Sequence, residues 1–522
     1  MRRATSSLLR SSLRRQRRAY SVVSTDANPP VKITALPNKI RVATESTPGH
    51  FSAVGLYVDA GSRYETPSTS GVSHFLDRMA FKTTSSRSDE EMAQAIDKLG
   101  GQILCSSSRE SIMYQSSHFH AATPLAMSLI ADTALQSSFL PEEIVAQREA
   151  ARYEIREVSA KPEMILPEIL HEVAYDGKTL GNPLLCPEHR IDLIDQPTLN
   201  GFMKQWYRPE RMVIAGAGMP HEELVELADK YFSSLTASPS PSTSSSRSSA
   251  QQVPSQLLHS SSTPTPFKSL TRAASSYLYP TSGVDAALSP ESSAATYTGG
   301  SHFIHNPSSE FNHVYLAFEG VGIHDDDVYT LATMQVLLGG GGSFSAGGPG
   351  KGMYSRLYTH ILNHYPQIDH CASFHHIYTD SSLFGLFASF VPAAGRHSAG
   401  NTPSQIFPHL VHQLSLLLYT PISETELQRA KNQLQSSLMM ALESRAVEVE
   451  DLGRQVLVHN RKVPVSEMCA KIDAVSAKSL RRVAQRIFSP EQAKRATVVT
   501  MGREDLPDRD ATLRKYGVGG AV

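Results

Sequence analysis

Two separate stretches of the chain show the same order of apolar and polar positions. Residues 54–61 (VGLYVDAG) in the first stretch and 314–320 (VYLAFEG) in the second alternate as a half-buried β-strand does, and each ends in glycine. A second strand-like run follows in each stretch, at residues 101–104 and 383–387. The alternation therefore predicts a β-sheet in each stretch.

Each stretch also contains a charged run with helical spacing. Residues 141–156 and 423–445 open with acidic side chains, which the helix dipole favours near a helix N-terminus, and carry apolar residues three and four positions apart. We therefore predict an α+β fold of two related α/β domains, each a sheet flanked by helices, joined by a linker. A chance likeness between two unrelated α/β domains is the alternative.

Residues 237–298 separate the two stretches and are rich in serine, proline, threonine and alanine. Such a segment buries too little apolar surface to offset the entropy cost of ordering it, so we predict a disordered linker or insertion. The predicted domains are residues 31–236 and 299–505. A partner-docking or phosphorylated segment is the alternative for the linker, which contains no motif for either role.

The first twenty residues have a composition of their own. Residues 1–20 hold seven arginines and no aspartate or glutamate, together with serines and with leucines that can share one helical face. This composition is typical of a mitochondrial transit peptide, and the run RAYS at 18–21 predicts cleavage near Tyr20 or Ser21. A nucleic-acid-binding arm or a nuclear signal is the alternative.

Charge and cysteine content exclude several classes of protein. The 522 residues carry a formal net charge of −1, which argues against a broad nucleic-acid-binding surface. Loss of residues 1–20 would remove seven positive charges and no negative one, which changes −1 to −8. The four cysteines lie far apart, so we expect free thiols. No apolar run is long enough to predict a membrane-spanning helix.

The segment 339–353 (GGGGSFSAGGPGKGM) is the most distinctive feature of the second stretch. Glycine lacks a Cβ, so its backbone adopts positive φ and can approach other groups closely. A mobile surface connection is the simplest interpretation. A phosphate-binding P-loop is not supported, because Gly352 follows Lys351 where serine or threonine is required, and a helix-like apolar run at 331–338 precedes the glycines.

Residues 74–78 (HFLDR) resemble the H-x-x-E-H helix of the pitrilysin-like zinc peptidases, the inverzincins. In that motif two histidines and a downstream glutamate bind zinc, and the motif glutamate activates water. Here His74 matches the first ligand and Glu154 the downstream one, whereas Asp77 replaces the general base and Arg78 the second histidine. An arginine is always protonated and would repel zinc. We therefore expect no metal and no catalytic residue on this chain, with His74 an ordinary helix histidine.

The altered zinc motif and the glycine-rich segment together are similar to one family, the alpha subunits of the mitochondrial processing peptidase. The similarity includes residues 157–187 and 426–456 and extends from about residue 31 to 505, apart from the low-complexity segment. These alpha subunits are non-catalytic members of the pitrilysin-like peptidases. The resemblance implies two related domains that form half of a clamshell around a polar chamber, with zinc on a beta-subunit partner.

The resemblance also implies a function in the mitochondrial matrix, with possible association with the inner membrane. The alpha subunit binds arginine-containing presequences of imported precursors, and the beta subunit cuts them. Acids lining the chamber would complement such peptides, and Asp380, Glu424 and Glu443 are candidates, although solvated surface acids are the simpler interpretation. The implied substrate-binding positions are Gly339, Gly340, Gly341, Gly342, Ser343, Phe344, Gly347, Gly348, Gly350, Lys351, Gly352 and Met353.

Two other functions remain open on the sequence. A core structural subunit of the respiratory cytochrome bc1 complex shares this ancestry and would explain the altered zinc motif, but it does not require the long glycine-rich segment. An active peptidase with an unusual site would need residues elsewhere to replace Asp77 and Arg78.

Overall fold

The computed structural model describes residues 31–236, 294–342, 353–393, 402–491 and 493–519. The predicted transit peptide, most of the predicted linker and the centre of the glycine-rich segment lie outside these residues. We call residues 31–236 the N-terminal half and residues 294–519 the C-terminal half.

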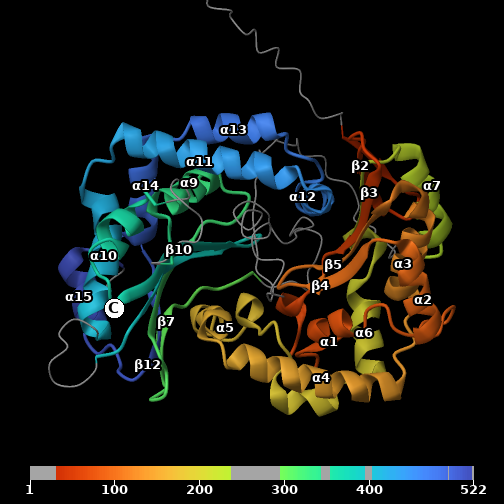
Figure 1. Ribbon diagram of the computed structural model, residues 1–522, viewed down its shortest axis with the longest axis horizontal. Coiled ribbons are helices and arrows are strands. Elements are labelled where there is room, and N and C mark those ends of the chain that lie inside the picture. Colours follow the sequence, from red (N-terminus) through yellow and green to blue (C-terminus); the bar gives the residue numbers. More distant parts are fainter. Residues whose placement is uncertain (1–30, 237–293, 343–352, 394–401, 492, 520–522) are drawn as a thin grey trace, which may run out of the picture.

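The N-terminal half builds one six-stranded sheet with helices around it (Figure 1). Its elements are, in order, β1 (Lys32–Ala35), β2 (Arg41–Glu45), β3 (Phe51–Val58), α1 (Val72–Arg78), α2 (Asp89–Leu99), β4 (Gln102–Ser107), β5 (Ile112–Phe119), α3 (Thr123–Gln136), α4 (Pro141–Ser159), α5 (Pro162–Ala174), α6 (Gln196–Trp206), β6 (Met212–Ala217) and α7 (His221–Phe232).

The C-terminal half builds a second six-stranded sheet. Its elements are β7 (Gly300–His305), β8 (Asn312–Gly320), α9 (Val328–Leu338), β9 (Gly340–Gly342), β10 (Ile368–Ile377), β11 (Ser382–Phe390), α10 (Pro403–Tyr419), α11 (Glu424–Leu442), α12 (Arg445–His459), α13 (Val465–Asp473), α14 (Ala477–Phe488), β12 (Thr497–Gly502) and α15 (Arg509–Tyr516).

The two sheets share one topology, which confirms the predicted pair of related domains. The strand orders are β1-β2-β6-β3-β5-β4 and β7-β12-β8-β11-β10-β9. In each sheet an early strand, β2 or β7, runs parallel to the last strand, β6 or β12. The remaining pairings of the shared five strands are antiparallel. The additional strands are β1 at one edge and the glycine strand β9 at the other.

The predicted helix over 141–156 is present as α4, whereas the predicted helix over 423–445 is wrong at its end. Ser423 begins α11 by accepting a hydrogen bond from the backbone N–H of Glu426. The helix stops at Leu442, and Ser444 adopts extended backbone (φ −81°, ψ 121°) from which α12 begins at Arg445. The charged run therefore folds as two helices that separate at a turn.

One helix of each half packs on the sheet of the other half. Helix α12 of the C-terminal half packs on the N-terminal sheet, where Leu452 and Val456 join a core with Tyr57 and Val213. Helix α5 of the N-terminal half packs on the C-terminal sheet. Figure 1 shows α12 beside β2 and β3, and α5 beside β7. The exchange makes the hydrophobic cores of the two halves interdependent.

Candidate functional site

The structure brings His74, Asp77, Arg78 and Glu154 together on two helices. The first three lie on α1, which packs against β4 and α6, and Glu154 projects from α4. We call these four residues the α1 cluster. Helix α1 spans residues 72–78, so the motif does form the helix that the zinc-peptidase pattern requires.

His74 and the Arg78 guanidinium both bond to the Glu154 carboxylate, where the zinc-peptidase pattern would have a metal ion. His74 Nε2 lies 3.1 Å from Glu154 Oε2, and Arg78 Nη1 bonds to the same carboxylate oxygen. The interaction with His74 is the main cause that lowers the pKa of the Glu154 carboxyl; partial burial opposes it, and the charge and hydrogen bond of Arg78 make smaller contributions in the same direction as His74. Arg78 therefore supplies the positive charge that stabilises Glu154.

The hydrogen bonds of His74 also disfavour zinc. The backbone N–H of Cys186 donates to His74 Nδ1 over 3.2 Å, so the ring proton belongs on Nε2, which donates to Glu154. A zinc-bound histidine would need the Nε2 lone pair free and its other N–H facing an acceptor. Neither condition holds, and no group of three or more metal-binding side chains occurs in the described part of the chain. The α1 cluster does not fit zinc.

Asp77 is turned away from the Arg78–Glu154 pair toward strand β4. Its carboxylate accepts hydrogen bonds from the backbone N–H of Ser107 at 2.8 Å and from the Ser107 hydroxyl at 3.3 Å. Burial raises the pKa of Asp77, and the bonds from Ser107 oppose that rise. Asp77 thus links α1 to the edge of the sheet, a structural role in place of a general base.

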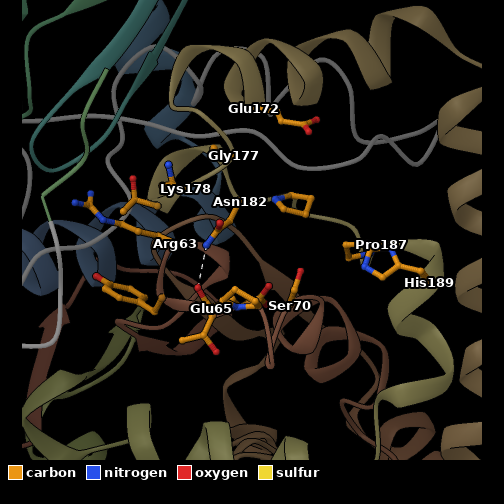
Figure 2. Close-up of a pocket in the computed structure, with 15 residues that line it drawn as sticks. Arg63, Glu65, Ser70, Glu172, Gly177, Lys178, Asn182, Pro187 and His189 are labelled. Carbon is orange, nitrogen blue, oxygen red and sulfur yellow. Dashed lines mark hydrogen bonds between the residues drawn. The ribbon is translucent and has the colours of Figure 1, made fainter. Parts of the chain in front are cut away.

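A pocket of about 730 Å³ lies beside the N-terminus of α1 (Figure 2). Glu65 caps the helix there, because its carboxylate accepts from the backbone N–H groups of Gly71 and Ser73, each at 2.7 Å. Burial raises the pKa of Glu65 to about 7. Asn182 donates to the Glu65 carbonyl at 3.1 Å, the dashed line in Figure 2.

The sequence analysis missed both Glu65 and Asn182. The only signal was a carboxylate six residues before the helix N-cap, Gly71, which has no side chain to satisfy the first N–H groups of the helix. Such a signal is weak, because many acids precede helices without contacting them.

The beginning of the glycine-rich segment is an ordered edge strand. Gly339 ends α9 with φ +60°, and Gly340–Gly342 pair with Ala372–His370 of β10. A Cβ at Gly340 would lie 2.1 Å from the carbonyl oxygen of Cys371, so a larger residue cannot replace glycine there without movement of the backbone. Residues 343–352, which contain the remaining predicted contacts before Met353, lie outside the described residues.

The residues that follow the glycine-rich segment are hydrogen-bonded to β9 and to α11. The Ser355 hydroxyl accepts from the N–H of Gly340 at 3.0 Å, and the Tyr358 hydroxyl donates to the Gly342 carbonyl at 3.0 Å. Arg356 forms two bonds to Glu426 of α11, at 2.5 and 3.0 Å. Met353 and Tyr354 beside these anchors are 38% and 62% exposed. The described residues on the two sides of 343–352 are thus bonded to each other, and the side chains of Met353 and Tyr354 are exposed beside them.

The three candidate chamber acids lie in different surroundings. Asp380 pairs with Arg63 of the N-terminal half at 2.5 Å and accepts from the Ala295 N–H at 2.8 Å. Burial raises its pKa, but the bonds from Arg63 bring it below the ordinary value. Glu443 lines a cavity of about 380 Å³, and Glu424 is exposed at the start of α11. Asp380 therefore joins the two halves.

Two peptidase families match successive parts of this chain. The family described as Insulinase (Peptidase family M16) matches residues 41–188, and the family described as Peptidase M16 inactive domain matches residues 194–434. The chain belongs to peptidase family M16. No helix in the described ranges combines the length and the apolar character needed to cross a membrane.

Within that family the chain is similar to proteins named as one subunit of a processing enzyme. It is 45% identical to the mitochondrial-processing peptidase subunit alpha of Neurospora crassa, over 90% of this chain and 85% of that protein. The human protein of the same name is 33% identical over 91% of this chain and 83% of its own length. A solved chain of complex III2 from Candida albicans, with Inz-5 bound, has a TM-score of 0.71 at 18% identity, covering 93% of this chain and 100% of that one, and shows the fold alone.

Proposed function

We propose that this chain is the non-catalytic, substrate-binding subunit of a heterodimeric zinc endopeptidase. Its partner, a beta subunit, carries the zinc and the catalytic residues. The pair removes arginine-containing presequences from precursor proteins imported into the mitochondrial matrix. This proposal joins the names of the relatives to the chemistry of the α1 cluster.

The observation that carries the proposal is the position of Arg78. Its guanidinium satisfies Glu154 directly, and the Cys186 N–H occupies the Nδ1 lone pair of His74. A chain with this arrangement has no metal-bound water to attack a peptide bond, so cleavage requires a second subunit. The role of this chain in the pair is then to bind the presequence.

The glycine-rich segment supports a binding role. Both of its ends are anchored, through β9 and through the Arg356–Glu426 pair, while Met353 and Tyr354 stay exposed beside them. We infer that residues 339–353 contact the presequence, with Lys351 and Met353 among the contact positions. Anchors at both ends reduce the conformational entropy that the segment loses on binding.

The proposal is tested by assaying presequence cleavage with this chain alone, with the beta subunit alone and with the two combined. We expect cleavage by the pair only, and its loss with a zinc chelator. Cleavage by this chain alone at the rate of the pair, abolished by chelator, would show that it holds its own catalytic metal.

The alternative function, a core structural subunit of the cytochrome bc1 complex, is supported by the similarity of fold alone. The likeness to the complex III chain is at 18% identity, whereas the identity to the Neurospora alpha subunit is 45%. Fractionation separates the two functions. A matrix heterodimer is expected here, and exclusive recovery with a detergent-extracted respiratory complex would favour the alternative.

A further inference from the structure

Two buried side chains and one partly buried lysine of the C-terminal half hold polar atoms that make no regular hydrogen bond within the part of the chain that is described. They are Tyr329 near the start of α9, His459 at the end of α12 and Lys471 on α13, and we call them the Tyr329 cluster. The atoms without a hydrogen-bond partner are Tyr329 Oη and both ring nitrogens of His459, and Lys471 Nζ has no contact of this kind beyond its ion pair with Glu467. Tyr329 is 2% exposed and His459 8%.

Lys471 contacts both Tyr329 and an acidic neighbour, Glu467. Lys471 Nζ lies over the Tyr329 ring, 5.3 Å from its centroid. The same Nζ forms an ion pair with Glu467 at 3.2 Å. Arg461 donates two hydrogen bonds to the Glu467 carboxylate, at 2.8 and 2.9 Å. The cluster is therefore surrounded by two cations and one carboxylate, which leaves an excess of one positive charge.

The local electrostatics disfavour a cation at this position. Burial, helped by the neighbouring His324, Arg461 and Lys471, lowers the pKa of His459 to about 3, although Glu467 opposes this shift. The bonds from Arg461 lower the pKa of Glu467 to about 2, so that this carboxylate is ionised and already engaged. The net positive charge around this imidazole disfavours a metal ion and attracts an anion.

Buried polar groups of folded proteins are nearly always paired, so unpaired ones indicate a bound water or ion. The Lys471 ammonium, the Tyr329 hydroxyl and one N–H of His459 are all donors, so an acceptor with negative charge suits this group of side chains. The Lys471 side chain is 27% exposed, which connects the cluster to solvent. We propose that the Tyr329 cluster binds a small oxyanion, either inorganic phosphate or a carboxylate. This site is separate from the proposed presequence contacts.

The test is calorimetric titration of the full chain with inorganic phosphate and, separately, with acetate at constant ionic strength. We expect saturable binding of at least one of them. Lys471→Gln is expected to weaken it about tenfold or more, because a charge-assisted bond is lost. The matched control Lys204→Gln removes an exposed lysine of α6 and should bind as the wild type does.

Tyr329→Phe separates binding from folding. It deletes a hydroxyl that bonds no described protein group, so the melting temperature without anion should not fall, while anion affinity should fall severalfold. Binding of phosphate but not acetate assigns the site to phosphate-like ions, and the reverse assigns it to carboxylates. Absence of saturable binding of either, or equal affinity in Lys471→Gln and Lys204→Gln, would overturn the proposal and leave only water in the cluster.

Discussion

At the scale of single residues, Arg78 compensates for the ligand that it replaces. It pairs with Glu154, whose side chain is 28% exposed, and so gives that carboxylate the positive charge that zinc would otherwise provide. The sequence was sufficient to predict the loss of metal binding from the chemistry of arginine. It could not predict the second obstacle, the Cys186 N–H at His74 Nδ1, because a contact over 112 positions leaves no local pattern.

Removal of the Arg78 charge should therefore destabilise the protein. We expect Arg78→Met to lower the free energy of unfolding by about 1–3 kcal/mol, because Glu154 loses its charged partner in a partly buried site. Arg152→Met, which removes a guanidinium from the solvent-exposed pair with Asp192, should destabilise the protein much less, because solvent screens that pair. Thermal unfolding of both variants measures the difference, and equal effects would argue against a special role for Arg78.

Glu65 makes stability depend on pH in a defined direction. Its pKa is raised by burial to about 7, so between about pH 4.5 and 7 the folded state binds more protons than the unfolded state does. The contribution of Glu65 to stability therefore falls as pH rises through that window, by about 3 kcal/mol at most. Melting temperatures of wild type and Glu65→Gln from pH 5 to 7.5 test this, and identical slopes would contradict it.

At the scale of elements, the alternation of apolar residues was enough to predict the strands β3, β8 and β11. It could not predict β9, since three glycines carry no side-chain pattern. Their pairing with β10 depends on long-range contacts, including the Ser355 and Tyr358 bonds. The break between α11 and α12 was also missed, because Ser444 lies within a run whose spacing is helical on both sides.

Removal of residues 343–352 tests the glycine-rich segment without disturbing its base. The remaining Gly339–Gly342 can still pair with β10, so folding and association with the beta subunit should persist. Affinity for a fluorescent presequence peptide should fall about tenfold or more, equivalent to at least about 1.4 kcal/mol. Deletion of residues 394–401, between β11 and α10, is the control. Unchanged peptide affinity after the first deletion would contradict the binding role.

At the scale of the whole molecule, the exchange of α5 and α12 makes the halves depend on each other. Apolar spacing along Leu452 and Val456 indicates a buried face, but it cannot say which sheet buries it. The duplication was therefore predictable from sequence, and the exchange was not. Ion pairs such as Arg63–Asp380 and the Arg41 bond to the Val456 carbonyl at 3.0 Å add polar links between the halves.

We expect that neither half folds alone. A chain cut within residues 237–293 should yield two fragments that are insoluble when expressed separately, because each exposes the sheet face that the missing helix covers. Co-expressed fragments should associate and elute together in size-exclusion chromatography. A soluble N-terminal fragment that melts cooperatively near the temperature of the full chain would contradict this interdependence.

The most direct test of the account is the turnover number of the reconstituted pair when this chain carries Asp77→Asn. Asparagine keeps an oxygen that can accept the Ser107 N–H, and it removes the carboxylate at the sequence position that a general base occupies in the zinc-peptidase motif. If this chain binds and does not catalyse, kcat should stay within about twofold of the wild-type pair. A general base contributes about 10²–10⁴-fold to rate, so a loss of that size with the pair still assembled would show that this chain takes part in the chemistry.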